Sequence, residues 1–89
     1  MRPLERSRRS ATFRPMMGQE LRKARQRAGL TQEQLSFRAG LSRPDISQLE
    51  RDLKSPTVDT LFLICDALQV SAADIVGRVE DARKRKAGP

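Results

Sequence analysis

The amino-acid sequence predicts a compact all-α domain of five helices. Apolar residues recur at spacings of three and four, which is the helical period, and Ser or Thr caps precede several of these runs. No stretch alternates between apolar and polar residues in the way that a half-buried strand does. A chain of 89 residues can form one packed unit, so we expect no second sensor or catalytic domain.

The first helix is predicted over residues 17–28. It follows from four apolar residues at helical spacing, Met17, Leu21, Ala24 and Ala28. Gly29 comes next and can adopt the left-handed conformation that closes a helix. Residues 1–16 contain scattered Arg, Ser and Pro without an apolar period, so we expect a flexible basic arm before the domain.

The second helix is short and begins at a capping-box pattern formed by Thr31 and Gln34. Gly40 ends the run that this pattern opens. We expect three residues of this helix to be apolar core positions, Leu35, Phe37 and Ala39.

The third helix begins at a second cap pair, Ser42 and Asp45. Pro44 is tolerated in the first turn because the N–H that it lacks has no intrahelical partner there. The helix is predicted to end near Arg51 or Asp52.

Two further helices complete the predicted domain. Thr57 follows a proline-ended loop and caps a helix whose expected core face holds Val58, Leu61, Ile64, Cys65 and Leu68. Ser71 and Asp74 open a short fifth helix that is expected to turn two residues inward, Ile75 and Val76. Residues 78–89 can extend this helix or fray, so the predicted domain is residues 17–77, followed by a basic C-terminal tail.

The chain carries 18 Lys and Arg against 11 Asp and Glu, a formal net charge of +7 with no His. Residues 1–16 hold five Arg and one Glu, and residues 78–89 hold five basic and two acidic side chains. Residues 17–77 balance eight basic with eight acidic side chains. The excess therefore lies at the two ends, a distribution typical of basic arms on a globular body, although charged ends also serve solubility alone.

Composition argues against several classes of protein. Three Phe with no Trp or Tyr argue against reading single strands by base stacking, which leaves double-stranded partners open. The longest apolar run, Leu61 to Cys65, is far shorter than the roughly 20 residues that cross a bilayer, so we expect no transmembrane segment. Neither basic end has an apolar face opposite its charge, so we expect no membrane partner. With no His and a single Cys on an apolar face, we expect no metal, cofactor, disulfide or enzymatic activity, and a cytoplasmic location.

The segment from Thr31 to Arg51 joins two short helices through a glycine turn. This is the geometry of a helix-turn-helix, whose second helix enters the major groove of DNA, although ordinary helical hairpins share it. The accompanying motifs are Thr31-Gln32-Glu33-x-Leu35, Ala39-Gly40-Leu41-Ser42, Ile46-Ser47-x-x-Glu50-Arg51 and Ser55-Pro56-Thr57. With these motifs, residues 17–76 resemble the repressor and Cro family of phage and bacterial regulators, the xenobiotic-response-element type of helix-turn-helix.

The resemblance implies a sequence-specific regulator of transcription that binds double-stranded DNA. It would be a repressor or an autoregulatory controller that reads a palindromic operator through the third helix. Two residues depart from the family pattern. Asp52 stands where the family usually has Gly, which predicts an Asp in the left-handed conformation. Pro44 stands where the family often has a polar residue that reads a base.

The predicted base contacts lie at the start and on the outer face of the third helix, namely Arg43, Pro44, Ser47 and Gln48. Arg43 can form two hydrogen bonds with guanine, and Gln48 can form two with adenine. Pro44 can contact only a thymine methyl group. The predicted phosphate contacts begin the second helix or flank the third: Thr31, Gln32, Ser42, Arg51, Lys54 and Ser55. The alternative for each phosphate contact is a helix cap or a solvated side chain, and the alternative for Arg43 is a phosphate contact or a solvated side chain.

Two further expectations concern stability and assembly. The resemblance implies an ion pair between Arg25 and Glu50 that joins the first and third helices, and we interpret it as structural. Phe62 and Leu63 fall outside the core face of their helix, and Val79 lies beyond the expected core of the domain. We therefore expect a homodimer formed through the C-terminal helices, as is common in the family, with a roomier core as the alternative.

A different class of function stays open beside DNA regulation. The same fold serves antitoxin-type or adaptor modules, in which a co-encoded protein partner is bound and DNA binding is secondary. The genes that neighbour this one would discriminate between the two hypotheses.

Overall fold

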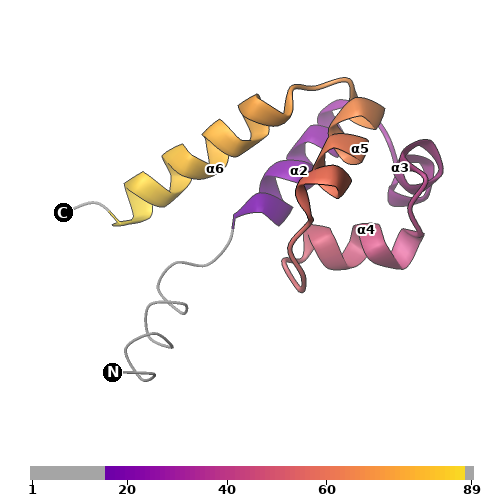
Figure 1. The fold of residues 1–89 in the computed structure, drawn as a ribbon, viewed down its shortest axis with the longest axis horizontal. Coiled ribbons are helices and arrows are strands. Elements are labelled where there is room, and N and C mark those ends of the chain that lie inside the picture. The colour runs from indigo at the N-terminus through magenta and orange to yellow at the C-terminus, as the bar shows by residue number, and fades with distance from the viewer. Residues whose placement is uncertain (1–15, 88–89) are drawn as a thin grey trace.

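The computed structural model describes residues 16–87, which form five helices: α2 (Met17–Arg27), α3 (Gln32–Ala39), α4 (Arg43–Glu50), α5 (Val58–Leu68) and α6 (Ala72–Ala87). These residues contain no strand, so the predicted all-α class is confirmed. Figure 1 shows α3 and α4 at one end of the domain, with α6 lying along α2. The predicted basic arm falls almost entirely outside the described residues.

The predicted helix starts are confirmed by their capping hydrogen bonds. Thr31 Oγ1 accepts from the backbone N–H of Gln34 at 3.0 Å, and Gln34 Oε1 accepts from the N–H of Thr31 at 2.9 Å. The same bond from the third helical residue to a hydroxyl oxygen opens the next three helices, at Ser42, Thr57 and Ser71. Local sequence therefore sets where each of these helices begins.

A single core holds the helices together. It consists of Leu21, Ala24, Leu35, Ala39, Ile46, Leu49, Leu61, Ile64, Cys65, Leu68 and Ile75. Every helix contributes to it, and α3 lies against both α4 and α5 while α2 lies against α4 and α6. The core therefore fixes the outward direction of α4, on which the candidate site is built.

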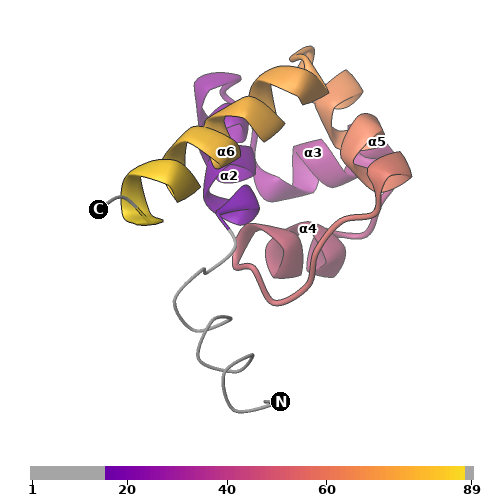
Figure 2. The same ribbon diagram turned by 60° about the vertical axis from the view of Figure 1, so that its left-hand side comes forward.

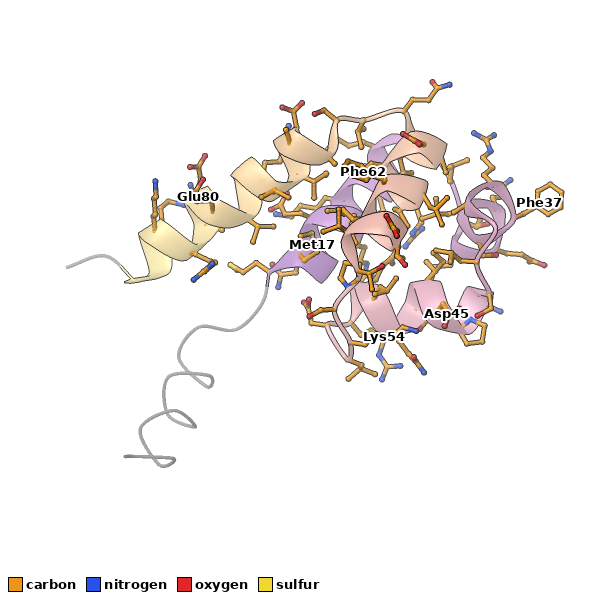
Figure 3. All side chains as sticks on the ribbon, in the orientation of Figure 1. Met17, Phe37, Asp45, Lys54, Phe62 and Glu80 are labelled. Carbon is orange, nitrogen blue, oxygen red and sulfur yellow. The ribbon has the colours of Figure 1, made fainter. Side chains whose placement is uncertain are left out.

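Three residues expected in the core lie instead on the surface. Phe37 is 89% exposed, and Val58 and Val76 are exposed as well. Leu35 and Ala39 are one helical turn apart and face the core together, so Phe37 between them points away. The inward position beside Leu35 belongs to Ser36, whose hydroxyl donates to the carbonyl of Glu33 at 2.7 Å. Figure 3 shows the Phe37 ring projecting from the domain.

α6 continues without a break through Gly77 to Ala87. Of the two alternatives for the residues after Gly77, the structure contains the helical extension, and Ala82 within it is buried. No single helix in residues 16–87 is both long and apolar enough to cross a membrane. α5 and the segment Ala72–Arg85 of α6 meet that criterion only as a pair, and a bend of 110° separates them.

The start of α2 is packed directly against the end of α4. A Cβ on Gly18 would lie 2.5 Å from the carbonyl oxygen of Leu49 and 2.6 Å from that of Glu50, so only glycine fits. The N–H of Gly18 donates to Asp52 Oδ1 at 2.9 Å. Asp52 has a φ of 57°, which confirms the predicted left-handed conformation. Its carboxylate supplies the cap that Met16, at the N-cap position of α2, does not provide.

Candidate nucleic-acid interface

α4 has one buried face and one open face. Ile46, Leu49 and Glu50 are buried, and the open face carries the four predicted base contacts. Three of these are exposed and Ser47 is half-buried. Figure 1 shows α4 along the lower edge of the domain, with its outer side clear of the other helices. This arrangement presents the predicted residues on one rigid element.

The last residue of α4 is held by an ion pair within the domain. Arg25 Nε donates to Glu50 Oε2 at 2.6 Å and Arg25 Nη2 donates to Glu50 Oε1 at 3.0 Å. Arg25 Nη1 also donates to the carbonyl of Leu30 at 2.8 Å, in the turn before α3. The two side chains are only 11% and 3% exposed. The hydrogen bonds to Glu50 raise the pKa of Arg25 above its ordinary value although burial opposes this. The pair thus fixes α4 relative to α2.

Gln32, a predicted phosphate contact, is connected to the same carboxylate. Its side chain is half-buried, and its Nε2 donates to Glu50 Oε1 at 3.1 Å. This bond was not predicted from the sequence, because eighteen positions separate the two residues and no local pattern relates them. Glu50 therefore joins α2, α3 and α4 at one point.

A second ion pair lies on the open side of α4. Lys54, another predicted phosphate contact, donates from Nζ to Asp45 Oδ1 at 2.7 Å. Both side chains are more than two-fifths exposed. The Lys54 ammonium, together with the hydroxyl of Ser42, holds the pKa of Asp45 below its usual range. Figure 3 shows Asp45 and Lys54 along the lower rim of the domain. From the sequence, Asp45 was expected only as a partner in the helix cap.

The remaining predicted phosphate contacts surround the two helix starts and the end of α4. Thr31 and Ser42 are the exposed cap residues of α3 and α4. Arg51 is exposed at the C-cap of α4, and Ser55 is exposed in the loop that follows. Two of the six predicted phosphate contacts, Gln32 and Lys54, already have partners inside the domain, Glu50 and Asp45 respectively.

The balanced charge of residues 17–77 is unevenly divided along the chain. Residues 17–54, which form α2, α3, α4 and the start of the next loop, hold eight basic and five acidic side chains. Residues 55–77 hold three acidic side chains and no basic one. Figure 2 shows α4 on the opposite side of the domain from α6. Residues 17–54, which contain α4, are therefore net positive, and α5 is net negative.

No group of three or more His, Cys, Asp or Glu side chains within residues 16–87 is placed to hold a metal ion. Cys65 is buried in the core, and desolvation raises the pKa of its thiol, which keeps the reactive thiolate form scarce. We interpret Cys65 as a packing residue.

Comparisons with known proteins identify relatives of this chain. A family model described as helix-turn-helix matches residues 21–75. The chain is 40% identical, over 72% of its own length and 83% of the relative's, to the uncharacterized HTH-type transcriptional regulator y4dJ of Sinorhizobium fredii. It is 38% identical over 61 residues to the immunity repressor protein of Bacillus phage phi105, covering 68% of this chain and 42% of that protein.

A solved structure is similar to this fold as well. The restriction-modification controller protein C.AhdI from Aeromonas hydrophila aligns with a TM-score of 0.66 and 30% sequence identity, over 68% of this chain and 92% of that one.

Proposed function

The chain belongs to the helix-turn-helix family of DNA-binding transcriptional regulators, which are not enzymes, and we propose that it reads a double-stranded operator with α4. The observation that carries this proposal is the two-sided character of α4. Its inner face is locked by Ile46, Leu49 and the ion-paired Glu50, while its outer face is open. A rigid helix with one open polar face is suited to the major groove.

Direct readout is assigned to the polar side chains of that face. Arg43 can donate two hydrogen bonds to guanine, and Gln48 can pair with adenine through its amide. Pro44 is limited to contact with a thymine methyl group, and Ser47, which is half-buried, reaches less far into the groove. The sequence preference should therefore depend mainly on Arg43 and Gln48.

Phosphate contacts would fix the register of α4 on the duplex. The capping box uses the N–H groups of Thr31 and Gln34, so a phosphate at the start of α3 would meet the N–H groups of Gln32 and Glu33. The other contacts proposed are the residues that flank α4: Ser42, Arg51, Lys54 and Ser55.

Selection of bound sequences from a random duplex pool tests the readout. We expect a defined consensus for the whole chain, and we expect Gln48→Ala to relax one adenine position at a cost of about 1–3 kcal/mol. Gln26→Ala is the matched control, because Gln26 is exposed on α2 and is not one of the proposed DNA contacts. Retention that is sensitive to salt but blind to sequence would exclude direct readout.

The proposed assembly is a homodimer that binds a palindromic operator. Phe62 and Leu63 are 52% and 47% exposed on α5, and Val79 is half-buried on α6, which leaves an apolar surface for a second copy. In such a dimer two α4 helices about 34 Å apart would match successive major grooves. Figure 3 shows Phe62 on α5, well separated from Phe37 on α3.

Sedimentation at low micromolar concentration tests the dimer. We expect Phe62→Ser to convert the dimer to monomer, whereas Phe37→Ser, which removes an even more exposed ring, should leave the dimer intact. A wild-type chain that sediments only as monomer, with and without the selected DNA, would contradict the dimer.

The regulatory role that we propose is that of a repressor or autoregulatory controller acting in the cytoplasm. It is supported by the names of the relatives, a phage immunity repressor and a restriction-modification controller. A reporter gene placed behind the selected sequence tests it. Expression should fall when the chain is present, and a rise in expression would indicate an activator instead.

The excess positive charge at the chain ends is proposed to supply non-specific attraction to DNA. Residues 1–16 carry five Arg, and changing all five to Gln should flatten the salt dependence of binding. The slope should fall by up to about 0.9 for each phosphate that the arm no longer neutralises, with the selected sequence unchanged. An unchanged salt slope would assign the N-terminal charge to solubility.

At the C-terminal end, substitution of the basic residues is preferable to deletion, because the buried Ala82 belongs to the packed part of α6.

A further inference from the structure

We propose that Asp45 is a specificity-determining residue that competes with DNA phosphates for the Lys54 ammonium. This inference rests on the proposed function, since it concerns how the DNA-facing side of α4 separates its operator from other DNA. The juxtaposition that carries it is the 2.7 Å contact between Lys54 Nζ and Asp45 Oδ1 at the edge of that side.

Asp45 is held in place independently of Lys54. It lies in the first turn of α4, where its backbone N–H donates to Ser42 Oγ at 3.1 Å. The other acid of α4, Glu50, is buried and occupied by Arg25 and Gln32. Asp45 is therefore the one carboxylate of α4 that is open to solvent, and it lies beside the exposed side chains that we assign to DNA contact.

Lys54 is held by this contact but not enclosed. It lies in the loop after α4, and its side chain is 43% exposed. Together with Asp45, it lines an open cavity of about 280 Å³ between α4 and the start of α5, which gives the side chain room to move. An exposed ion pair of this kind is weak enough to be exchanged for a phosphate contact. The pair can therefore act as a reversible competitor.

Competition of this kind affects specific and non-specific binding differently. Non-specific binding depends on the number of cations available to phosphates, and Asp45 neutralises one of them. In the operator complex the register is fixed, and an ammonium group has three N–H donors, so Lys54 can donate to Asp45 and to one phosphate together. Asp45 would then hold the flexible Lys54 stem in the position that the specific complex needs.

The decisive experiment is a double-mutant cycle on non-specific DNA. The salt dependence of binding to a random-sequence duplex is measured for the whole chain, Asp45→Asn, Lys54→Gln and the double variant. We expect Asp45→Asn to steepen the slope by up to about 0.9, which makes binding at about 0.1 M salt roughly eightfold tighter than that of the wild-type chain when the two affinities are equal at about 1 M salt. Lys54→Gln should change the slope little in the wild-type chain and should abolish the gain in the Asp45→Asn chain.

An equal decrease of slope on Lys54→Gln in both backgrounds would overturn the competition while leaving the proposed function intact. Absence of duplex binding by the wild-type chain would overturn the proposed function and this inference together. Asp45→Ser, which keeps a small polar residue in the first turn of α4, serves as a second variant if the thermal melt shows that Asp45→Asn is poorly folded.

A second measurement tests specificity directly by comparing the affinities for two DNA sequences. The ratio of affinities for the selected sequence and for the random duplex should fall several-fold in Asp45→Asn. Asp59→Asn is the matched control, because it removes an exposed carboxylate from α5, and it should leave the ratio unchanged. An unchanged ratio in Asp45→Asn would exclude a role in specificity.

Discussion

The two carboxylates of α4 form ion pairs of nearly the same length in opposite surroundings. Glu50 accepts from Arg25 at 2.6 Å and Asp45 accepts from Lys54 at 2.7 Å. Glu50 is almost completely buried and also accepts from Gln32, whereas the Asp45 pair is open to water at the edge of the outer face of α4.

The comparison shows that distance alone does not determine what an ion pair does. A buried pair is costly to break, because the remaining charge has no water to solvate it. An exposed pair contributes little to stability, since water and salt screen it. The inner pair, Arg25 and Glu50, is therefore suited to holding α4 in place. The outer pair, Lys54 and Asp45, is suited to exchange with a ligand.

The largest expected difference between the pairs is in stability. Glu50→Ala should lower the free energy of unfolding by about 3–5 kcal/mol, because it leaves the Arg25 guanidinium buried without its partner. Asp45→Ala should lower it far less, because the outer pair is exposed to water and salt. Urea denaturation at neutral pH measures both. A melting temperature unchanged by Glu50→Ala would contradict the structural role of the inner pair.

The next largest expected difference in stability is between two glycines, Gly18 beside the end of α4 and Gly77 in α6. Gly18→Ala should destabilise the domain by about 1–3 kcal/mol, because the added methyl group meets the carbonyl oxygens of Leu49 and Glu50. Gly77→Ala in α6 meets nothing within 4 Å, so helix propensity should make it stabilising by up to about 1 kcal/mol. Thermal unfolding of the two variants tests the contrast, and equal shifts would refute the close packing at Gly18.

The smallest expected effect is on the titration of the outer pair. Because the folded-state pKa of Asp45 is lowered, the pair stabilises the folded chain above pH about 4, and this stabilisation is lost as the pH falls through the folded-state pKa. Lys54→Gln should raise the pKa of Asp45 towards its ordinary value. Carboxyl NMR titration measures it, with Lys84→Gln on α6 as the control. A pKa unmoved by Lys54→Gln would mean that Lys54 is not the main cause of the shift.

Charge is also divided unevenly between two parts of the domain, the part that contains α4 and the part that contains α5. Counting by segment along the chain described the domain as neutral, yet the part with α4 is net positive and α5 has only acidic charges. The total over residues 17–77 is balanced, whereas counts over residues 17–54 and 55–77 differ in sign. For a regulator that binds DNA through one side, the placement of charge matters more than its sum.

Local features were predictable because they depend on residues three or four positions apart. The capping box at Thr31 and the cap at Ser42 follow from short-range hydrogen bonding. The left-handed conformation of Asp52 was implied by the family resemblance, because the family usually has Gly at that position. The position of Phe37 was predicted wrongly, although the helical period already argued against it. Three apolar residues at a spacing of two cannot all face one side of a helix.

The sequence by itself determined the helices, their caps and the helix-turn-helix, because these depend on interactions within one or two turns. Only the tertiary structure decided that Gly18 lies against the end of α4, that Glu50 binds Gln32, and that Asp45 holds Lys54. These contacts join residues separated by nine or more positions. Their geometry depends on how the helices pack, and no local period or cap encodes that arrangement.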